Sequence, residues 1–130
     1  MVFVNMTPYN PNPPAPGGGA RPALAELLGP DASLTVAIPT MLEVLPPGAS
    51  KRAGVRAFCD HHGIDEASEL AAVGDGENDA EMLRAAALGV AVANAGAAAM
   101  SAADIVVASN DAGGAAQAIR MALALASPVR

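Results

Sequence analysis

Two short strand patterns and one helix pattern open the regular part of the chain. Leu34–Ile38 alternates apolar and polar residues in the manner of a strand, and Met41–Leu45 is a second short strand candidate. Ser50 can cap a helix that runs to about His62. The expected buried face of this helix has four residues at helical spacing, namely Val55, Phe58, Cys59 and His62.

The second half of the chain repeats a strand and helix cycle. Leu70–Val73 is a short apolar run, as expected for a buried parallel strand. Beyond it the pattern predicts helices over 79–87, 97–102 and 112–126 and strands over 89–93 and 105–108. Strands that alternate with helices at this spacing favour an α/β fold with a mostly parallel sheet and helical crossovers.

The amino-terminal part has a different composition. Residues 8–22 contain six prolines and a run of three glycines, which indicates a flexible segment, and a short helix is expected over 22–28. We therefore divide the chain into a flexible segment over 1–32, a pair of strands over 33–45 and the α/β part over 46–130.

Charge and composition exclude several function classes. The 130 residues include 7 Lys plus Arg and 13 Asp plus Glu, a formal net charge of −6 that disfavours binding to nucleic acid phosphates. The single cysteine, Cys59, excludes an internal disulfide and reads as a buried packing thiol. No apolar run reaches the roughly 18 residues of a membrane span, and no secretory signal opens the chain. We expect an intracellular, soluble protein without a membrane partner.

The strongest chemical signal is the segment Gly74-Asp75-Gly76-Glu77-Asn78-Asp79, at the carboxyl end of a predicted buried strand. Ligands bind at that edge of open parallel sheets. Four carboxylates crowd into seven positions, counting Glu81, and a hard cation such as Mg²⁺ would relieve their repulsion. The glycines allow a sharp turn and a close approach to a ligand, and the Asn78 amide can contact a phosphate oxygen.

A purely structural interpretation of this segment is equally open. Asn78 with Glu81 resembles a capping box, and Gly-Asp-Gly is a common turn composition. Dinucleotide, EF-hand and Walker motifs do not fit the spacing. The only lysine, Lys51, favours the functional interpretation: a lysine in a first helical turn is disfavoured by the helix dipole, and an anionic partner would explain it.

Together these segments resemble the haloacid dehalogenase-like superfamily, specifically the Cof-type sugar-phosphate and related phosphatases. The resemblance runs from about Leu34 to Ile119. Five ordered segments carry it, namely Glu43–Lys51, Gly74–Met82, Gly89–Ala95, Ala103-Asp104 and Ser109–Gly114. It implies a partial three-layer Rossmann-like core over 46–130, preceded by a remnant of the family's cap domain over 33–45.

The resemblance also implies roles for four residues. Lys51 resembles the family's lysine that balances charge on the nucleophile and the phosphoryl group. The resemblance implies a metal site at Asp75 and Asp79. Asp75 resembles the magnesium ligand, and Asp79 the supporting carboxylate that orients the metal's water shell or Lys51. Asn78 resembles a phosphate contact. The implied cofactor is Mg²⁺, and the implied substrate is a small phosphorylated metabolite. Such chemistry depends on positioning and charge neutralisation.

One expected feature of the family has no counterpart in the sequence. The nucleophilic Asp-x-Asp-Gly-[Thr/Ser] motif does not occur, and the nearest amino-terminal look-alike, Val2–Thr7, has no carboxylate. Without a nucleophile no aspartyl phosphate can form, so we expect the chain to be inactive alone. We also expect an uncovered sheet edge beside the strand that ends at Asp75, which favours self-association or a partner chain.

Two alternative functions stay open. A relict module that retains Mg²⁺ or phosphate affinity is the first, and the phosphorylation domain of a P-type ion pump, which shares Gly-Asp-Gly-x-Asn-Asp, is the second. The pump is disfavoured because no membrane span follows Asp111. His61-His62 does not indicate a metal site, because adjacent residues on a helix face different ways.

Overall fold

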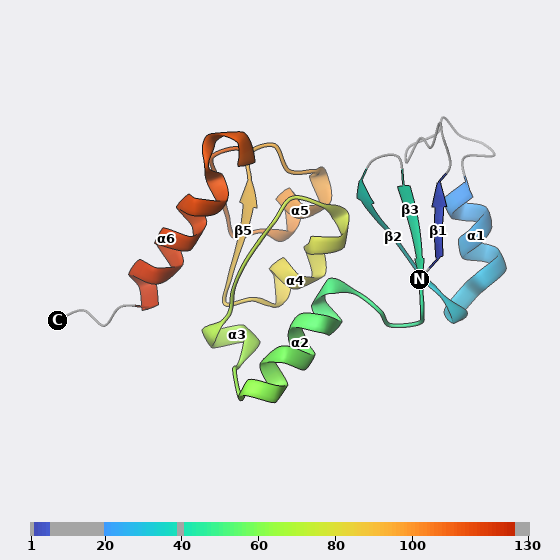
Figure 1. Cartoon of the computed structure of the whole chain (residues 1–130), viewed down its shortest axis with the longest axis horizontal. Helices are drawn as coiled ribbons and strands as arrows, with labels where there is room; N and C mark the ends of the chain where they lie inside the picture. Colours follow the sequence, from blue (N-terminus) through green and yellow to red (C-terminus); the bar gives the residue numbers. More distant parts are fainter. Residues whose placement is uncertain (1, 6–19, 39–40, 127–130) are drawn as a thin grey trace.

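The computed structural model describes residues 2–5, 20–38 and 41–126, which form two three-stranded sheets and six α-helices (Figure 1). In chain order the elements are β1 (Val2–Asn5), α1 (Ala20–Leu28), η1 (Gly29–Asp31), β2 (Ser33–Ile38), β3 (Met41–Leu45), α2 (Lys51–His62), α3 (Glu66–Glu69), β4 (Ala71–Gly74), η2 (Glu77–Asp79), α4 (Ala80–Ala85), β5 (Leu88–Val92), α5 (Ala97–Ala102), β6 (Ile105–Val107), η3 (Asn110–Ala112) and α6 (Gly114–Ala126). The three η elements are 3₁₀ turns.

The first sheet is antiparallel and has the strand order β1-β3-β2. Leu42 and Val36 are buried on one face, where Leu34 and Leu24 of α1 pack against them. β1 pairs with β3 with Val4 opposite Leu42, so the segment 1–32 that we expected to be flexible contains a strand as well as the expected helix. Most of the Pro/Gly-rich stretch, residues 8–19, lies outside the described residues.

The second sheet is parallel, with the order β4-β5-β6, and helices cover both of its faces. One face carries large side chains, since Val90, Val92 and Val107 pack with Ala118 and Met121 of α6. The other face carries small residues at aligned positions, and Ala72 packs there against Leu83 of α4 and two alanines of α5. Three layers therefore form around this sheet, which confirms the predicted α/β class.

Small residues on the second face allow α4 to lie very close to the sheet. A Cβ built on Gly89 would lie 2.4 Å from the carbonyl oxygen of Leu83. A Cβ on Gly74, which is aligned with Ala91 on the next strand, would lie 2.5 Å from the Cβ of Asp79. Since real Cβ atoms do not approach other atoms this closely, both positions require glycine.

The predicted apolar face of α2 is wrong in part. Cys59 is buried as expected, and burial raises the pKa of its thiol, but Phe58 is 60% exposed and His62 is exposed. The Phe58 ring instead lies against the His62 ring at a centroid distance of 4.4 Å. The residues that turn inward are Arg52, Val55 and Cys59, because the helix buries a narrower stripe than the face that the sequence predicted.

The other predicted elements all form, with boundaries shifted by at most two residues. The short helix α3 was not predicted; Asp65 caps it by accepting a hydrogen bond from the backbone N–H of Ala67 at 3.2 Å. Among the described residues, no helix combines the length and the apolar character that crossing a bilayer requires. The boundaries at 32/33 and 45/46 between the proposed parts of the chain stay a prediction.

Candidate functional site

Asp79 organises the loop that follows β4. It is 3% exposed, and its Oδ2 accepts hydrogen bonds from the backbone N–H groups of Asp75 and Gly76 at 3.0 and 2.9 Å. The Asp79 side chain therefore caps the backbone of the turn that precedes it. It takes the place of the Asn78 and Glu81 capping box that the sequence suggested. Neither Gly74 nor Gly76 adopts a positive φ; they make room for neighbouring side chains rather than for a sharp turn.

Lys51 lies at the same point. Its Nζ donates a hydrogen bond to Oδ1 of Asp79 at 2.5 Å, across 28 residues of sequence. Ser50 places it there by capping α2, since its hydroxyl oxygen accepts from the backbone N–H of Ala53 at 3.1 Å. Burial by itself would raise the pKa of Asp79, but the hydrogen bond from Lys51, the two backbone N–H groups and the charge of Lys51 together hold that pKa below its usual value.

Asp75 is held by its backbone while its side chain stays exposed. Its N–H donates to Asp79, and its carbonyl oxygen accepts from the backbone N–H of Gly96 at 2.8 Å. Within the described part of the chain, the Asp75 carboxylate makes no hydrogen bond or ion pair. A fixed backbone with a solvent-facing carboxylate suits a ligand for a cation.

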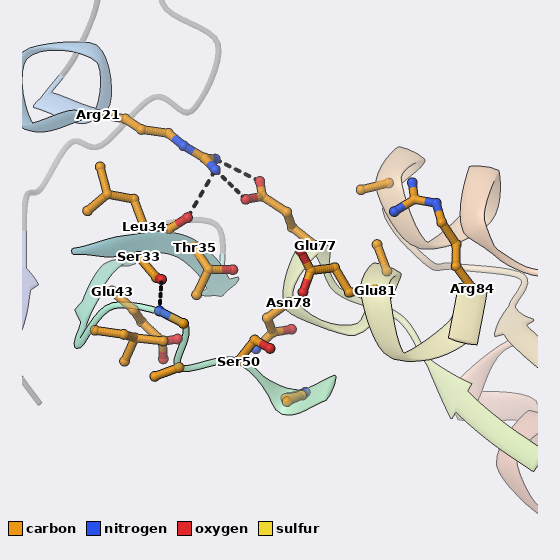
Figure 2. Close-up of a pocket in the computed structure, with 16 residues that line it drawn as sticks. Arg21, Ser33, Leu34, Thr35, Glu43, Ser50, Glu77, Asn78, Glu81 and Arg84 are labelled. Atoms are coloured by element: carbon orange, nitrogen blue, oxygen red, sulfur yellow. Dashed lines mark hydrogen bonds and ion pairs between the residues drawn. The ribbon is translucent and has the colours of Figure 1, made fainter. Parts of the chain in front are cut away.

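Glu77 forms a salt bridge with Arg21 of α1, the helix that packs on the first sheet. The Arg21 guanidinium donates to both of its carboxylate oxygens, at 2.8 and 2.6 Å, and to the carbonyl oxygen of Leu34 at 3.3 Å (Figure 2). Both side chains are about one-third exposed, at 35% and 37%, so water weakens the pair and its contribution to stability is about 1 kcal/mol or less. Its structural effect is to hold α1 and β2 against the loop.

The four crowded carboxylates are therefore separated by cations of this chain. Arg21 partners Glu77 and Lys51 partners Asp79, which leaves Asp75 and Glu81. Among the described residues, no three side chains of His, Cys, Asp or Glu form a group that could hold a metal ion. Charge repulsion, which motivated the predicted cation, is thus relieved in part without one.

A cavity of about 480 Å³ lies between the first sheet and this loop (Figure 2). Lys51 and Asn78 line it, whereas Asp75 and Asp79 do not. Arg21, Glu43 and Thr35 line it from the first sheet's side, and none of these three was singled out from the sequence. Of the predicted site residues, the structure therefore brings Lys51, Asp75 and Asp79 together by hydrogen bonds and places Asn78 beside them on η2.

The sequence model of the haloacid dehalogenase-like hydrolases matches residues 20–119. The chain belongs to this family. The match includes α1 and both sheets except β1, so the resemblance stated from short motifs is confirmed, and it extends further toward the amino terminus than Leu34.

Two relatives of this chain are much longer than the chain itself. Over 99 residues it is 44% identical to the chloroplastic endoribonuclease YBEY of Arabidopsis thaliana, covering 76% of this chain and 17% of that protein. It is 41% identical over 75 residues to the HMP-PP phosphatase of Cronobacter sakazakii, covering 58% of this chain and 27% of that protein. The chain thus spans between one-sixth and about one-quarter of these relatives.

Solved structures agree on the fold. A phosphatase of this superfamily from Bacteroides thetaiotaomicron is 35% identical with a TM-score of 0.70, covering 79% of this chain and 38% of that one. A sugar phosphatase of HAD subclass IIB is 33% identical with a TM-score of 0.68, covering 78% of this chain and 39% of that one. The Rossmann-like core and the phosphatase character of the family are therefore established.

Two parts of the site were not predicted from the sequence. Arg21 stands in the stretch that composition assigned to a flexible segment, so nothing indicated that it would meet Glu77 56 residues later. Asn94 and Asn110 lie in segments that carried the resemblance, and they join through a hydrogen bond of 2.8 Å at the ends of β5 and β6. The rule that parallel strands end at one edge could have paired them.

Proposed function

We propose that this chain is the carboxyl-terminal part of a Mg²⁺-dependent phosphomonoesterase that acts on small sugar-phosphate-like metabolites. The single observation that carries the proposal is the Lys51 to Asp79 hydrogen bond beside a cavity that Lys51 and Asn78 line. A buried carboxylate that fixes a half-exposed ammonium at the mouth of a cavity provides a positioned positive charge for a phosphate group. The names of the phosphatase relatives support the same reaction class.

Each residue has a distinct role in this proposal. Lys51 binds a phosphate oxygen and neutralises its charge, and Asn78 donates its amide to another. Asp79 is a positioning residue, because its carboxylate is occupied by Lys51 and by the backbone of Asp75 and Gly76. These contacts orient the phosphoryl group, and orientation with charge neutralisation is the main source of catalysis in phosphoryl transfer.

The residues present fit a magnesium ion only in part. Asp75 offers an exposed carboxylate on a fixed backbone and would be one ligand. Asp79, the second ligand suggested by the resemblance, has both oxygens engaged and would act through its neighbours. When bound, the ion would supply positive charge to phosphate oxygens. We propose that the remaining ligands and the nucleophilic carboxylate come from a segment outside this sequence.

The proposal predicts phosphate binding without turnover for the isolated chain. Purified protein incubated with Mg²⁺ and p-nitrophenyl phosphate should release no nitrophenol above background, because these 130 residues contain no nucleophile motif. Titration calorimetry should detect binding of inorganic phosphate to the chain. Lys51→Ala should abolish this binding, whereas Arg56→Ala, a change at an exposed residue of α2, should not. If the chain hydrolyses the substrate and Asp75→Ala abolishes this activity, the proposal that its catalytic site is incomplete is wrong. If Lys51→Ala binds phosphate as tightly as the wild type, the proposed phosphate site is wrong.

We propose that the free edge of β4 is covered by another strand. β4 pairs only with β5 among the described strands, although helices cover both faces of the sheet around it. An unpaired edge presents N–H and C=O groups that favour addition of a strand, from a partner chain or a second copy. Light scattering on the purified chain should therefore report self-association. A monodisperse, thermally cooperative monomer would refute it.

A further inference from the structure

The cavity has two walls of different chemistry. The wall on the loop side carries Asn78, Glu81 and Arg84, and the opposite wall is one face of the first sheet (Figure 2). Lys51 of α2 also lines the cavity. Because side chains alternate along a strand, Val36 and Leu42 pack toward α1, whereas the residues on the opposite face of β2 and β3 line the cavity. We call this second wall the sheet wall, which consists of Ser33, Thr35, Glu43 and Leu45.

The sheet wall presents hydrogen-bonding groups in a fixed arrangement. Thr35 lies directly opposite Glu43 across the antiparallel pair of β2 and β3, so their side chains share one face at a spacing of about 5 Å between Cβ atoms. The hydroxyl oxygen of Ser33 accepts from the backbone N–H of Gly48 at 3.1 Å, which leaves its own O–H to donate elsewhere. Hydroxyl groups beside a carboxylate are complementary to a polyol.

Charge distinguishes the two walls. Arg21 of α1 pairs with Glu77 and Lys51 of α2 pairs with Asp79, so both cations meet their anionic partners at the loop. Among the described residues, no cation lies within ion-pair distance of the Glu43 carboxylate, which is half-buried on the sheet wall. A second anionic group that reached this wall would meet an unbalanced negative charge, and like charges in contact are strongly unfavourable.

We propose that Glu43 is a specificity-determining residue, which accepts hydrogen bonds from hydroxyl groups of a phosphomonoester and rejects a second anionic group in the same molecule. This inference rests on the proposed function, since the phosphate bound at Lys51 and Asn78 directs the rest of the molecule toward the sheet wall. The favoured ligand class is a monophosphate whose remainder is neutral and hydroxylated. Thr35 lies opposite Glu43, where its hydroxyl can donate to or accept from a hydroxyl group of the ligand.

A matched pair of ligands tests this assignment. Glycerol 3-phosphate and 3-phosphoglycerate share one carbon skeleton and differ by a CH₂OH group in place of a carboxylate. Titration calorimetry on the 130-residue chain should give an affinity about tenfold higher for glycerol 3-phosphate than for 3-phosphoglycerate. Glu43→Gln should remove most of this preference, whereas Glu26→Gln, on the exposed side of α1 and outside the cavity, should preserve it.

The outcomes separate this inference from the function on which it rests. Inorganic phosphate affinity should be the same in Glu43→Gln as in the wild type, while Lys51→Ala should weaken all three ligands. If phosphate binds through Lys51 but Glu43→Gln leaves the ratio of the two affinities unchanged, the role of Glu43 is wrong and the phosphate site stands. If no ligand binds, or Lys51→Ala has no effect, both proposals fail.

Discussion

Asp79→Asn is expected to lower the free energy of unfolding by about 2 kcal/mol, because a buried carboxylate that receives charged and backbone hydrogen bonds is replaced by an amide. The amide can still accept from the backbone, but its NH₂ group then faces the ammonium of Lys51. In a domain of about 100 residues, this loss corresponds to a decrease in melting temperature of about 10 °C. Differential scanning calorimetry measures it.

The pH dependence of this loss has a definite sign. The pKa of Asp79 lies below its usual value in the folded state, so its stabilising contribution is fully present above the unfolded pKa of about 4 and is lost as the pH falls through the folded pKa. Wild type and Asp79→Asn should therefore differ most at neutral pH and converge in acid. A constant difference across this range would contradict the assigned ionisation.

The exposed Asp31→Asn is the matched control. Asp31 lies in η1 at the surface, far along the chain from the loop, so its amide variant should melt with the wild type at every pH. Phosphate binding should be lost in Asp79→Asn and retained in Asp31→Asn, measured at a temperature where both are folded. If Asp79→Asn binds phosphate as tightly as the wild type, Asp79 does not position Lys51 for this purpose.

The strand and helix order was predictable because local patterns determine it. Val90 and Val92 alternate with small residues, and Ser50 and Gly63 bound α2 by cap chemistry that depends on neighbours in sequence. The motif residues were predictable for a related reason: a buried strand followed by Gly-Asp-Gly locates them at a sheet edge. The hydrogen bonds of these residues were harder to predict, since the sequence fits two arrangements equally well. In one Asp79 accepts from the backbone of Asp75 and Gly76, and in the other Asn78 caps the helix.

Features that depend on segments distant in sequence could not be predicted from local patterns. The salt bridge between Arg21 and Glu77 depends on how α1 and β2 lie against the loop, which no periodicity encodes. The exposure of Phe58 has the same origin: its helical position fits a buried face, but the helix α2 contacts its neighbours along a narrower stripe. The pairing of β1 with β3 likewise joins residues about 40 positions apart, beyond a segment whose composition indicates a linker.

Gly74→Ala is expected to damage the site more than its size suggests. The new Cβ would lie 2.5 Å from Cβ, 2.7 Å from Cγ and 2.9 Å from Oδ2 of Asp79, so the loop must move to admit one methyl group. Overpacking of this kind costs about 1 to 3 kcal/mol. Because the displaced atoms hold Lys51, phosphate binding measured by calorimetry on the folded variant should also be lost.

Two further glycines separate a displaced Asp79 from a general packing defect. Gly89→Ala places its Cβ 2.4 Å from the Leu83 carbonyl oxygen, so it should destabilise the same layer of the fold while phosphate still binds. Gly54→Ala, in α2, meets no atom within 4 Å of the new Cβ apart from its chain neighbours and the helix backbone, and it should raise stability by about 0.5 to 1 kcal/mol. If Gly74→Ala and Gly89→Ala lower phosphate affinity equally, the loss reflects loosened packing of α4, and the close contact between Gly74 and Asp79 has no specific part in binding.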